Sequence, residues 1–347
     1  MRIAVDIGFG FVKAMNEKGE KVSFPSVLAK RSDSALRGII GGAIDDYSIT
    51  YWEDGTNGVK ENEKKMYIGE AAMTNGGERK WDDKGKFNIE DLKVFISVAI
   101  GLINPDNEPV ELCVGLPMSY YIDVKDSLRE ALKSLKAYVS IYGLKPAREI
   151  ATKNLFIFPQ GAGAYYAAIY SIDGQIKDYE LAGSSVGVID IGYRTVDYLV
   201  MGKGRKGLTM LDGLFGSLED EGMNIAFQDI QRSLVDSGKI KEEVGIIEIE
   251  KALLWFGGKL EYKTGEIDIT EYEEMAYIER AEQIASKIKI KWGTEGNVIR
   301  KIFITGGGGE ALCAVLKNKF DQAVLQDNPS HANCEGYLGA QARKMKK

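Results

Sequence analysis

Two segments of the sequence place a lone aspartate at the end of an apolar stretch and directly before a glycine turn. One is AVDIGFGFVKAM, which contains Asp6 and Lys13, and the other is VIDIGYRTVDYL, which contains Asp190. Both are flanked by strand-like sequence, so each predicts a hairpin of two strands. Glycines permit a tight reversal that bulkier residues resist, and exposed amides in such a turn form a concavity that binds anions. The two segments together predict a site for a nucleotide's phosphates and their magnesium ion.

The charged side chains of these hairpins have separate predicted roles. Magnesium keeps several waters in its octahedral shell, so we expect Asp6 and Asp190 to bind it through water. Lys13 would neutralise phosphate oxygens as a point charge. A single aspartate in such a place is better explained as a strand-end turn former, whereas the repeated pair favours a metal.

The segment PQGAGAY contains Gln160 at a predicted turn between a strand and a helix. An amide has no useful basicity, so Gln160 would position an attacking water rather than deprotonate it. Gln160 is equally well explained as a polar residue at a helix N-terminus, and the sequence leaves both interpretations open.

A third candidate element is the run of four glycines in FITGGGGEAL. Consecutive glycines cost conformational entropy and add nothing to a core, but they let the backbone lie flat against a ring or approach phosphates at a helix N-terminus. We expect a purine to lie across Gly306 to Gly308. A plain flexible loop is the alternative, and the strand and helix predicted immediately on either side argue against it.

Composition excludes several classes of function. The 347 residues suggest about two domains, and the net charge of −6 argues against direct nucleic-acid binding. No apolar run reaches the roughly 20 residues of a membrane span. The three cysteines and the single histidine, His331, cannot assemble a conventional zinc site, and the cysteines are best explained as buried thiols in a reducing cytoplasm.

The pattern of apolar residues predicts two similar halves, each a mixed sheet flanked by helices and each beginning with one Asp-Gly hairpin. We expect a meander of strands over residues 2–29. Helices are predicted over Ile89 to Ile103, from about Val124 to Lys136, and from Thr270 to Lys291, the last capped by Thr270.

With these elements in order, the sequence resembles the superfamily of actin, sugar kinases and heat-shock-chaperone ATPases. DIGFGFVK and DIGYRTVD are similar to its two phosphate loops, and ITGGGGE is similar to its adenosine loop. PQGAGAY and CEGYLGAQA are similar to its two connecting helices. Within the superfamily the chain most resembles the prokaryotic actin-like proteins of the ParM (StbA) plasmid-segregation type and their archaeal relatives. The pointers are the FPS of residues 24–26, the D-x-G-x-x-T-x-D form of the second loop, and GGGGEALCAVLKNKF.

The resemblance implies an α/β, actin-like fold of two RNase H-like domains with a nucleotide cleft between them, each with an inserted subdomain. Domain I would span residues 1–165, with an insertion at about 31–85, and would be completed by the C-terminal helix 333–347. Domain II would span residues 166–332, with an insertion at about 210–285.

The resemblance also implies an activity and partners. The expected function is hydrolysis of ATP or GTP, with Mg²⁺, coupled to assembly of the chain into cytomotive filaments that segregate plasmid DNA in the cytoplasm. DNA would be held by a DNA-binding adaptor protein of the ParR type, with no direct nucleic-acid or membrane contact.

Site residues can be carried over by position. Asp6 and Asp190 would serve the magnesium, and Gln160 would orient the hydrolytic water. The remaining nucleotide contacts would be the first loop (Gly8, Phe9, Gly10, Phe11, Lys13), the second loop (Gly192, Tyr193, Arg194, Thr195), the base site (Gly306, Gly307, Gly308, Glu310) and the ribose candidates Glu250 and Lys251.

The chain departs from the family pattern at two places. Phe9 replaces a small polar residue, which removes a hydroxyl from the γ-phosphate. Tyr193 and Arg194 replace a small pair, so Arg194 either contacts phosphate or faces outward.

Two other functions fit the same fold. A small-molecule (sugar or acyl) kinase would need a carboxylate base beside its acceptor hydroxyl, and the sequence shows no distinct acceptor motif. A scaffold that binds nucleotide with negligible turnover is conceivable because of Phe9.

Overall fold

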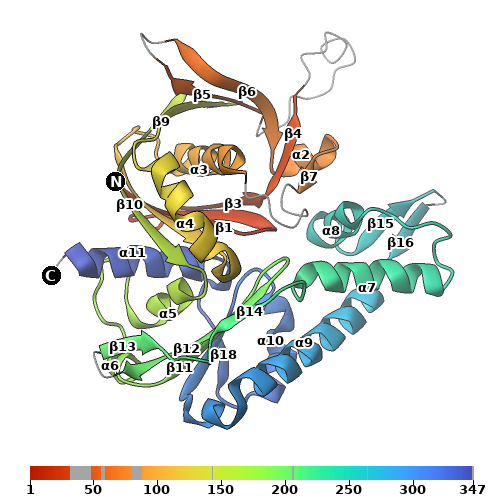
Figure 1. Cartoon of the computed structure of the whole chain (residues 1–347). Helices are drawn as coiled ribbons and strands as arrows, with labels where there is room; N and C mark the ends of the chain where they lie inside the picture. Colours follow the sequence, from red (N-terminus) through yellow and green to blue (C-terminus); the bar gives the residue numbers. More distant parts are fainter. Residues whose placement is uncertain are drawn as a thin grey trace. The chain divides into compact units, whose positions relative to one another are not determined.

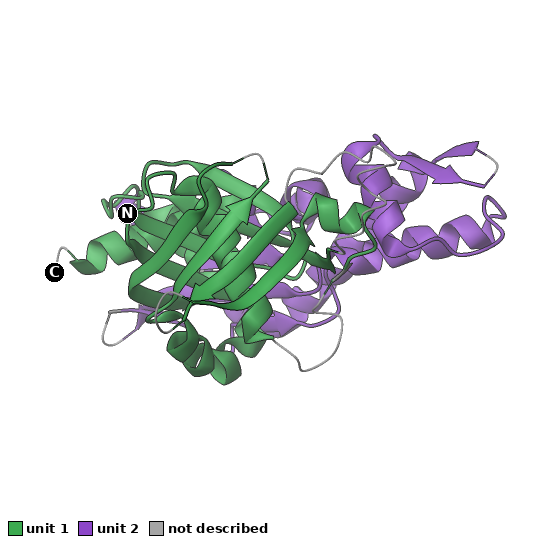
Figure 2. Cartoon of the chain, turned by 90° about the horizontal axis from the view of Figure 1, so that it is seen from above, with its two compact units in different colours: residues 1–177, 331–347 green, residues 178–330 purple. Residues whose placement is uncertain are grey.

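The chain divides into two compact units in the computed structural model (Figure 2). Unit 1 contains residues 1–177 and 331–347, and unit 2 contains residues 178–330. The structure describes residues 1–31, 48–55, 59–79, 88–142, 144–204, 207–263 and 265–345. Much of the insertion expected at about 31–85 therefore lies outside the described residues.

The sheet of unit 1 is built around the first hairpin. β1 (Arg2–Ile7) pairs antiparallel with β2 (Phe11–Asn16) and parallel with β8 (Val110–Leu116), which pairs parallel with β10 (Arg148–Pro159). The other described strands are β3 (Lys21–Pro25), β4 (Val27–Lys30), β5 (Ser48–Asp54), β6 (Lys60–Ile68), β7 (Glu78–Arg79) and β9 (Lys136–Ile141). The order of all the strands in this sheet is β3-β2-β1-β8-β10-β9-β5-β6-β4-β7. The predicted meander over residues 2–29 is confirmed for β1 to β3, but its last part is wrong, because β4 pairs with β6 and β7 instead.

The helices of unit 1 follow the apolar pattern with one exception. α3 (Ile89–Ile103) has the predicted bounds and begins at Asn88, whose side chain accepts a hydrogen bond from the amide of Glu90. α4 (Met118–Leu132) begins and ends earlier than the predicted Val124 to Lys136. The prediction was wrong because Pro117, which ends the preceding strand, also has a φ of −51° that suits a helix start, and the helix begins directly after it. α2 (Glu70–Thr74) lies between β6 and β7.

Two helices with small residues pack closely in unit 1. α5 (Ala162–Ile169) and α11 (Ala332–Met345) lie side by side in Figure 1. A Cβ added to Gly336 would lie 1.7 Å from the carbonyl oxygen of Gly163. Only glycine at this position permits the two backbones to approach so closely. This contact fixes the C-terminal helix on the helix that follows Gln160.

Unit 2 repeats the arrangement of the first hairpin. β11 (Val186–Ile191) pairs antiparallel with β12 (Val196–Gly204) and parallel with β17 (Lys301–Thr305), which is followed by β18 (Ala323–Leu325). β13 (Gly207–Met210) and β14 (Gly216–Leu218) also pair with β12, and β15 (Lys259–Tyr262) and β16 (Gly265–Asp268) form a separate hairpin. Each unit is thus a mixed sheet with helices, as the sequence predicted.

The helices of unit 2 are α6 (Tyr179–Ala182), α7 (Met223–Asp236), α8 (Ile246–Trp255), α9 (Thr270–Trp292) and α10 (Gly309–Lys319). α9 has nearly its predicted bounds, but Thr270 does not cap it, because Thr270 is the first helical residue and Ile269 is the cap position. Asp268 instead accepts hydrogen bonds from the backbone amide and the hydroxyl of Thr270, at 3.1 and 2.7 Å.

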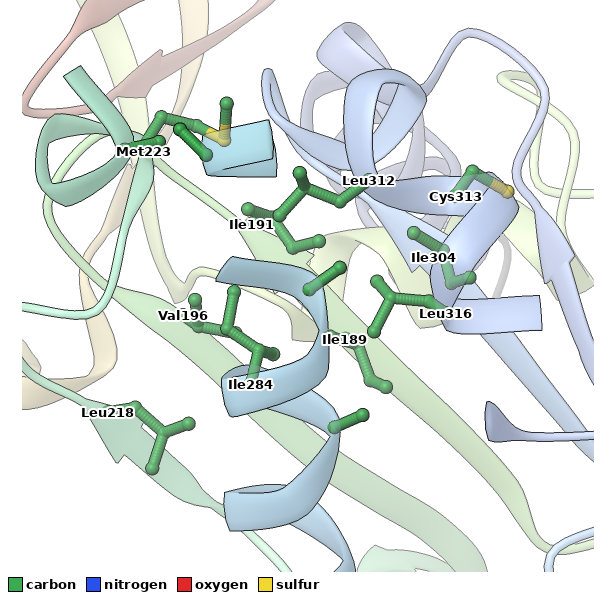
Figure 3. Packing of buried hydrophobic residues seen from close by; sticks show 14 of the residues in the cluster. Ile189, Ile191, Val196, Leu218, Met223, Ile284, Ile304, Leu312, Cys313 and Leu316 are labelled. Atoms are coloured by element: carbon green, nitrogen blue, oxygen red, sulfur yellow. The ribbon is translucent and has the colours of Figure 1, made fainter. Parts of the chain in front are cut away.

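The core of unit 2 holds the second hairpin in place. Figure 3 shows Ile189 and Ile191 of β11 packed with Ile304 of β17 and with Leu312 and Leu316 of α10. Successive side chains of a strand point to opposite faces. Burial of the two isoleucines therefore fixes Asp190, which lies between them, on the other face of the sheet.

Candidate functional site

The first hairpin brings Asp6 and Lys13 together. The two residues face each other across the antiparallel pair of β1 and β2, and Asp6 is 4% exposed. Burial raises the pKa of the Asp6 carboxyl above its ordinary value, against the opposing effects of the Lys13 charge and of hydrogen bonds from Gln160 and Asn333. A buried carboxylate that is costly to charge is suited to holding a cation.

Gln160 lies against the same carboxylate. Its Nε2 donates to Oδ1 of Asp6 at 2.7 Å and to the carbonyl oxygen of Ile7 at 3.1 Å. Because the amide nitrogen is directed at Asp6, the amide oxygen is the atom with which Gln160 would accept a hydrogen bond from water. The sequence placed Gln160 at a strand-to-helix turn, and the structure adds the contact with Asp6.

Asn333, at the start of α11, is a site residue that the sequence analysis missed. Its Nδ2 lies 3.4 Å from Oδ2 of Asp6, and its Oδ1 accepts from the amides of Gly161 and Ala164, each at 3.1 Å. Asn333 thus caps α5 from a distant part of the chain. No local pattern reveals such a cap, since the two partners are about 170 residues apart.

The turn of the first hairpin presents backbone rather than side chains. The amide of Gly8 donates to the carbonyl oxygen of Phe11 at 3.1 Å. The Phe9 ring is 6% exposed and packs edge-on against Tyr120 of α4, with 5.7 Å between ring centroids. The departure at Phe9 is therefore absorbed by packing on α4, and the residue would contact phosphate only through its backbone.

The second hairpin has a different pair of residues at the corresponding positions. Asp190 faces Asp197 across the pair of β11 and β12, where the first hairpin has Asp6 and Lys13. On its other side Asp190 lies beside Thr305, the last residue of β17. The two hairpins thus share a carboxylate at the end of their first strand, and only the first hairpin supplies an ammonium group opposite it.

The tetraglycine turn lies directly against Asp190. Gly306 has a φ of +86°, and a Cβ added there would lie 2.4 Å from Oδ1 of Asp190 and 2.3 Å from the carbonyl oxygen of Ile191. The amide of Gly308 donates to that same carbonyl oxygen at 2.9 Å. The glycines at 306 and 308 are therefore required by close approach, and the turn is held by the hairpin rather than being a flexible loop.

The side chains of the second turn anchor it to neighbouring elements. The Arg194 Nε lies 3.0 Å from Oδ1 of Asp220, and the Tyr193 ring packs on Phe227 of α7. The amides of Met223 and Asn224, at the start of α7, donate to the carbonyls of Gly192 and Tyr193. Arg194 is 8% exposed and paired with Asp220, so it does not face outward.

The ribose candidates lie on α8. Glu250 is 1% exposed. Burial raises the pKa of Tyr277 on α9, and the charges of Glu273 and Glu250 raise it further. The Lys251 Nζ lies 2.8 Å from Oε1 of Glu248 in the same helix. The structure places Glu250 next to α9 and directs Lys251 along α8.

A pocket of about 420 Å³ opens between α9 and α10, within the size range of small-molecule sites. It is lined by Thr270, Glu273, Glu274, Tyr277, Ile278, Ala311, Ala314 and Val315. Ala311 lies in the first turn of α10, directly after the tetraglycine turn, and Glu310 beside it is exposed. None of the four glycines of this turn lines the pocket, which lies beside the helix that begins at Gly309.

Few of the described side chains are placed to ligate a metal ion. Among the described residues, no three His, Cys, Asp or Glu side chains gather closely enough to hold an ion by themselves. Asp6 lies in unit 1 opposite Lys13, and Asp190 lies in unit 2 opposite Asp197. Such residues fit a magnesium ion that takes most of its ligands from water and phosphate oxygens.

Comparison with known proteins identifies the family of both halves. Residues 4–163 match the family of actin-like proteins, N-terminal domain, and residues 188–318 match the archaeal actin homologue MreB-like family, C-terminal. The chain belongs to the actin-like proteins.

Relatives of this actin-like chain match over nearly its whole length. It is 24% identical to an archaeal actin homolog of Thermoplasma volcanium, with 99% of both sequences covered. It resembles the ParM of a 15-stranded Clostridium botulinum filament, with 28% identity, a TM-score of 0.80 and coverage of 98% and 99% of the two chains. An archaeal actin homolog in complex with ADP, 19% identical over 99% of each chain, has the same fold, with a TM-score of 0.74.

These matches confirm the predicted actin-like fold of two α/β domains, and they do not favour the kinase alternative. No described helix is both long and apolar enough to cross a membrane.

Proposed function

We propose that this actin-like chain binds ATP or GTP with Mg²⁺, hydrolyses it, and couples the hydrolysis to assembly and disassembly of filaments. The observation that carries the proposal is the repeated hairpin. In each unit a buried aspartate ends the first strand, and a glycine turn with an available backbone follows it. One triphosphate held by both turns would make the arrangement of the two units depend on the nucleotide.

The phosphates would be held mainly by backbone. The turns around Gly8 to Phe11 and Gly192 to Thr195 would supply amides, and Lys13 would supply a positive charge to the first turn alone. Magnesium, when bound, would neutralise phosphate charge, and Asp6 and Asp190 would hold it through water. The base would lie against Gly306 to Gly308 and the pocket between α9 and α10.

Gln160 would position the attacking water. Its amide nitrogen is occupied by Asp6 and by the carbonyl of Ile7, which sets the direction of the amide oxygen. Because an amide is not a base, Gln160 would contribute by orientation, and proton transfer would pass to the phosphate or to solvent.

Similarity to a ParM filament supports self-association as the first partner. We propose plasmid DNA segregation in the cytoplasm as the cellular role, with an adaptor of the ParR type carrying the DNA, because the acidic chain is poorly suited to bind DNA directly. A mobility-shift assay with the purified chain alone should show no DNA binding at physiological salt.

High-speed pelleting tests the proposal. The chain is sedimented without nucleotide, with ATP, with GTP and with an analogue of each in which NH replaces the β–γ bridging oxygen, while phosphate release is followed in parallel. We expect nucleotide-dependent sediment that persists longest with an analogue. Turnover that requires an added alcohol or sugar would instead indicate a kinase.

A Gln160→Ala variant tests the role of this side chain. We expect it to sediment with nucleotide but to release phosphate at least about a hundredfold more slowly, because misplacing a reacting group can lower the rate by that factor. Gln228→Ala, an exposed change on α7, is the matched control. Unchanged phosphate release in Gln160→Ala would remove Gln160 from the proposed mechanism.

A further inference from the structure

Arg79, the last residue of β7, is a buried arginine that the proposed reaction does not use. Its side chain is 6% exposed. The Nη1 atom donates to the carbonyl oxygen of Gly10 at 2.6 Å and lies 3.4 Å from the carbonyl oxygen of Phe9. A buried guanidinium is costly unless it is well bonded, and here part of its bonding comes from the turn of the first hairpin.

Ser26 binds the same turn from the same side. Its hydroxyl donates to the carbonyl oxygen of Gly8 at 2.6 Å, and its amide donates to that of Gly10 at 2.8 Å. Ser26 directly precedes β4, and Val27 of β4 pairs with Arg79 of β7. The donors to the turn therefore come from neighbouring positions on two paired strands.

These bonds set the direction of the amides in the turn. In a planar trans peptide the C=O and the following N–H point in opposite directions. Carbonyls of Gly8, Phe9 and Gly10 that face Ser26 and Arg79 leave the N–H groups of Phe9, Gly10 and Phe11 directed to the other side. Successive amides on one side of a turn are the anion-binding arrangement that the sequence predicted.

We propose that Arg79 is a positioning residue that, with Ser26, orients the first phosphate loop and so determines affinity for the nucleotide's phosphates. The inference rests on the proposed nucleotide binding and goes beyond it. It assigns the small strand β7, which lies outside the hairpin in sequence, an indirect part in phosphate recognition. Binding of nucleotide at the loop would then depend on the positions of β4 and β7.

Substitutions at position 79 separate the effect of side-chain geometry from the effect of charge. Arg79→Lys keeps a positive charge but loses the planar, multi-donor head that can serve two carbonyls. Arg79→Met keeps much of the length and removes the charge. Ser26→Ala removes one donor to the same loop, without any change in charge.

The experiment compares two probes on monomeric protein below its assembly concentration. One probe is the β–γ imido analogue of the nucleotide that the wild type prefers, with Mg²⁺, and the other is the matching nucleoside, which lacks phosphates. We expect Arg79→Lys and Arg79→Met to weaken analogue binding by about tenfold or more, as for loss of a charge-assisted hydrogen bond. We expect nucleoside affinity to change by less than about twofold, since the base site lies in unit 2.

Arg148→Lys is the matched control. The Arg148 Nη1 also donates to a backbone carbonyl, that of Pro105 at 2.8 Å, in a loop of unit 1 outside the hairpin. We expect this variant to bind both probes as the wild type does, and Ser26→Ala to weaken analogue binding selectively.

Arg79→Lys with wild-type affinity for the analogue would overturn the inference while leaving the proposed function intact. Equal loss of both probes with a lower unfolding midpoint would also overturn it, because that pattern indicates a general structural role. A wild type that binds neither the ATP analogue nor the GTP analogue would overturn the proposed function as well.

Discussion

At the scale of single residues, Asp6 is the side chain whose position is hardest to explain by folding alone. It is 4% exposed at the end of a central strand, and burial raises its pKa. The folded chain therefore holds a carboxylate where ionisation is unfavourable, although Lys13 lies opposite it and the side-chain amides of Gln160 and Asn333 donate hydrogen bonds to it. The proposed magnesium site would explain this cost, because a bound cation stabilises the charged form of a carboxylate.

We predict that Asp6→Asn stabilises the nucleotide-free protein at neutral pH, by roughly 1 kcal/mol, because it removes a buried charge, while it weakens binding of the magnesium–nucleotide complex by about tenfold or more. The native pKa of Asp6 is above its unfolded value, so the native state binds the proton more tightly. The wild type should therefore gain stability relative to Asp6→Asn as the pH falls through the native pKa toward the lower unfolded pKa, and should lose that gain as the pH rises back through the native pKa. Denaturant unfolding at a series of pH values measures the difference.

Asp229→Asn on α7 is the control, because burial also raises the pKa of Asp229. It should change the pH dependence of stability but leave nucleotide affinity unaltered. A wild type and an Asp6→Asn variant with parallel stability profiles across pH would contradict the account of Asp6.

At the scale of elements, the phosphate loops are positioned by their neighbours. The first turn is held by β4, β7 and α4, and the second by the start of α7. The tetraglycine turn is held by β11. Asn333 likewise positions the helix after Gln160, because it lies at the start of α11 and contacts both the start of α5 and Asp6. The candidate site thus depends in part on β7, α4, α7 and α11, which contribute no proposed ligand.

We predict that Asn333→Ala lowers the free energy of unfolding by about 1–2 kcal/mol, as for loss of a helix cap. It should also slow phosphate release, because Gln160 directly precedes the capped amide of Gly161. Hydrogen exchange at the start of α5 should become faster. Asn154→Ala, which removes an exposed contact with Glu111, should stay within about 0.5 kcal/mol of the wild type. Unchanged exchange in α5 would show that Asn333 does not act as its cap.

At the scale of the whole molecule, the proposed function requires two units to act on one ligand. Asp6 belongs to unit 1 and Asp190 to unit 2. If both hold the same magnesium–triphosphate complex, replacing either aspartate should lose most of the binding free energy that the pair contributes.

A double-mutant cycle tests this requirement. We predict that Asp6→Asn and Asp190→Asn each weaken binding of the magnesium–analogue complex by about tenfold or more, and that the double variant is little weaker than either single variant. Isothermal titration measures all four affinities. Additive losses would mean that the two carboxylates serve independent sites, and the single-complex model would then fail.

The sequence by itself determined the two hairpins, the tetraglycine turn between a strand and a helix, and the actin-like fold. The hairpins and the glycine turn are local features, because a strand ending in Asp-Gly or a run of glycines limits the backbone wherever it occurs. The fold was inferred from the resemblance that these segments carry in their order. The tertiary structure decided the early start of α4, the Asp268 bond to Thr270, and the burial of Phe9 and Arg194. It also brought Asn333 to Asp6 and Arg79 to the first loop. Those pairings join residues far apart in the chain, and only the packing of complete elements brings such residues into contact.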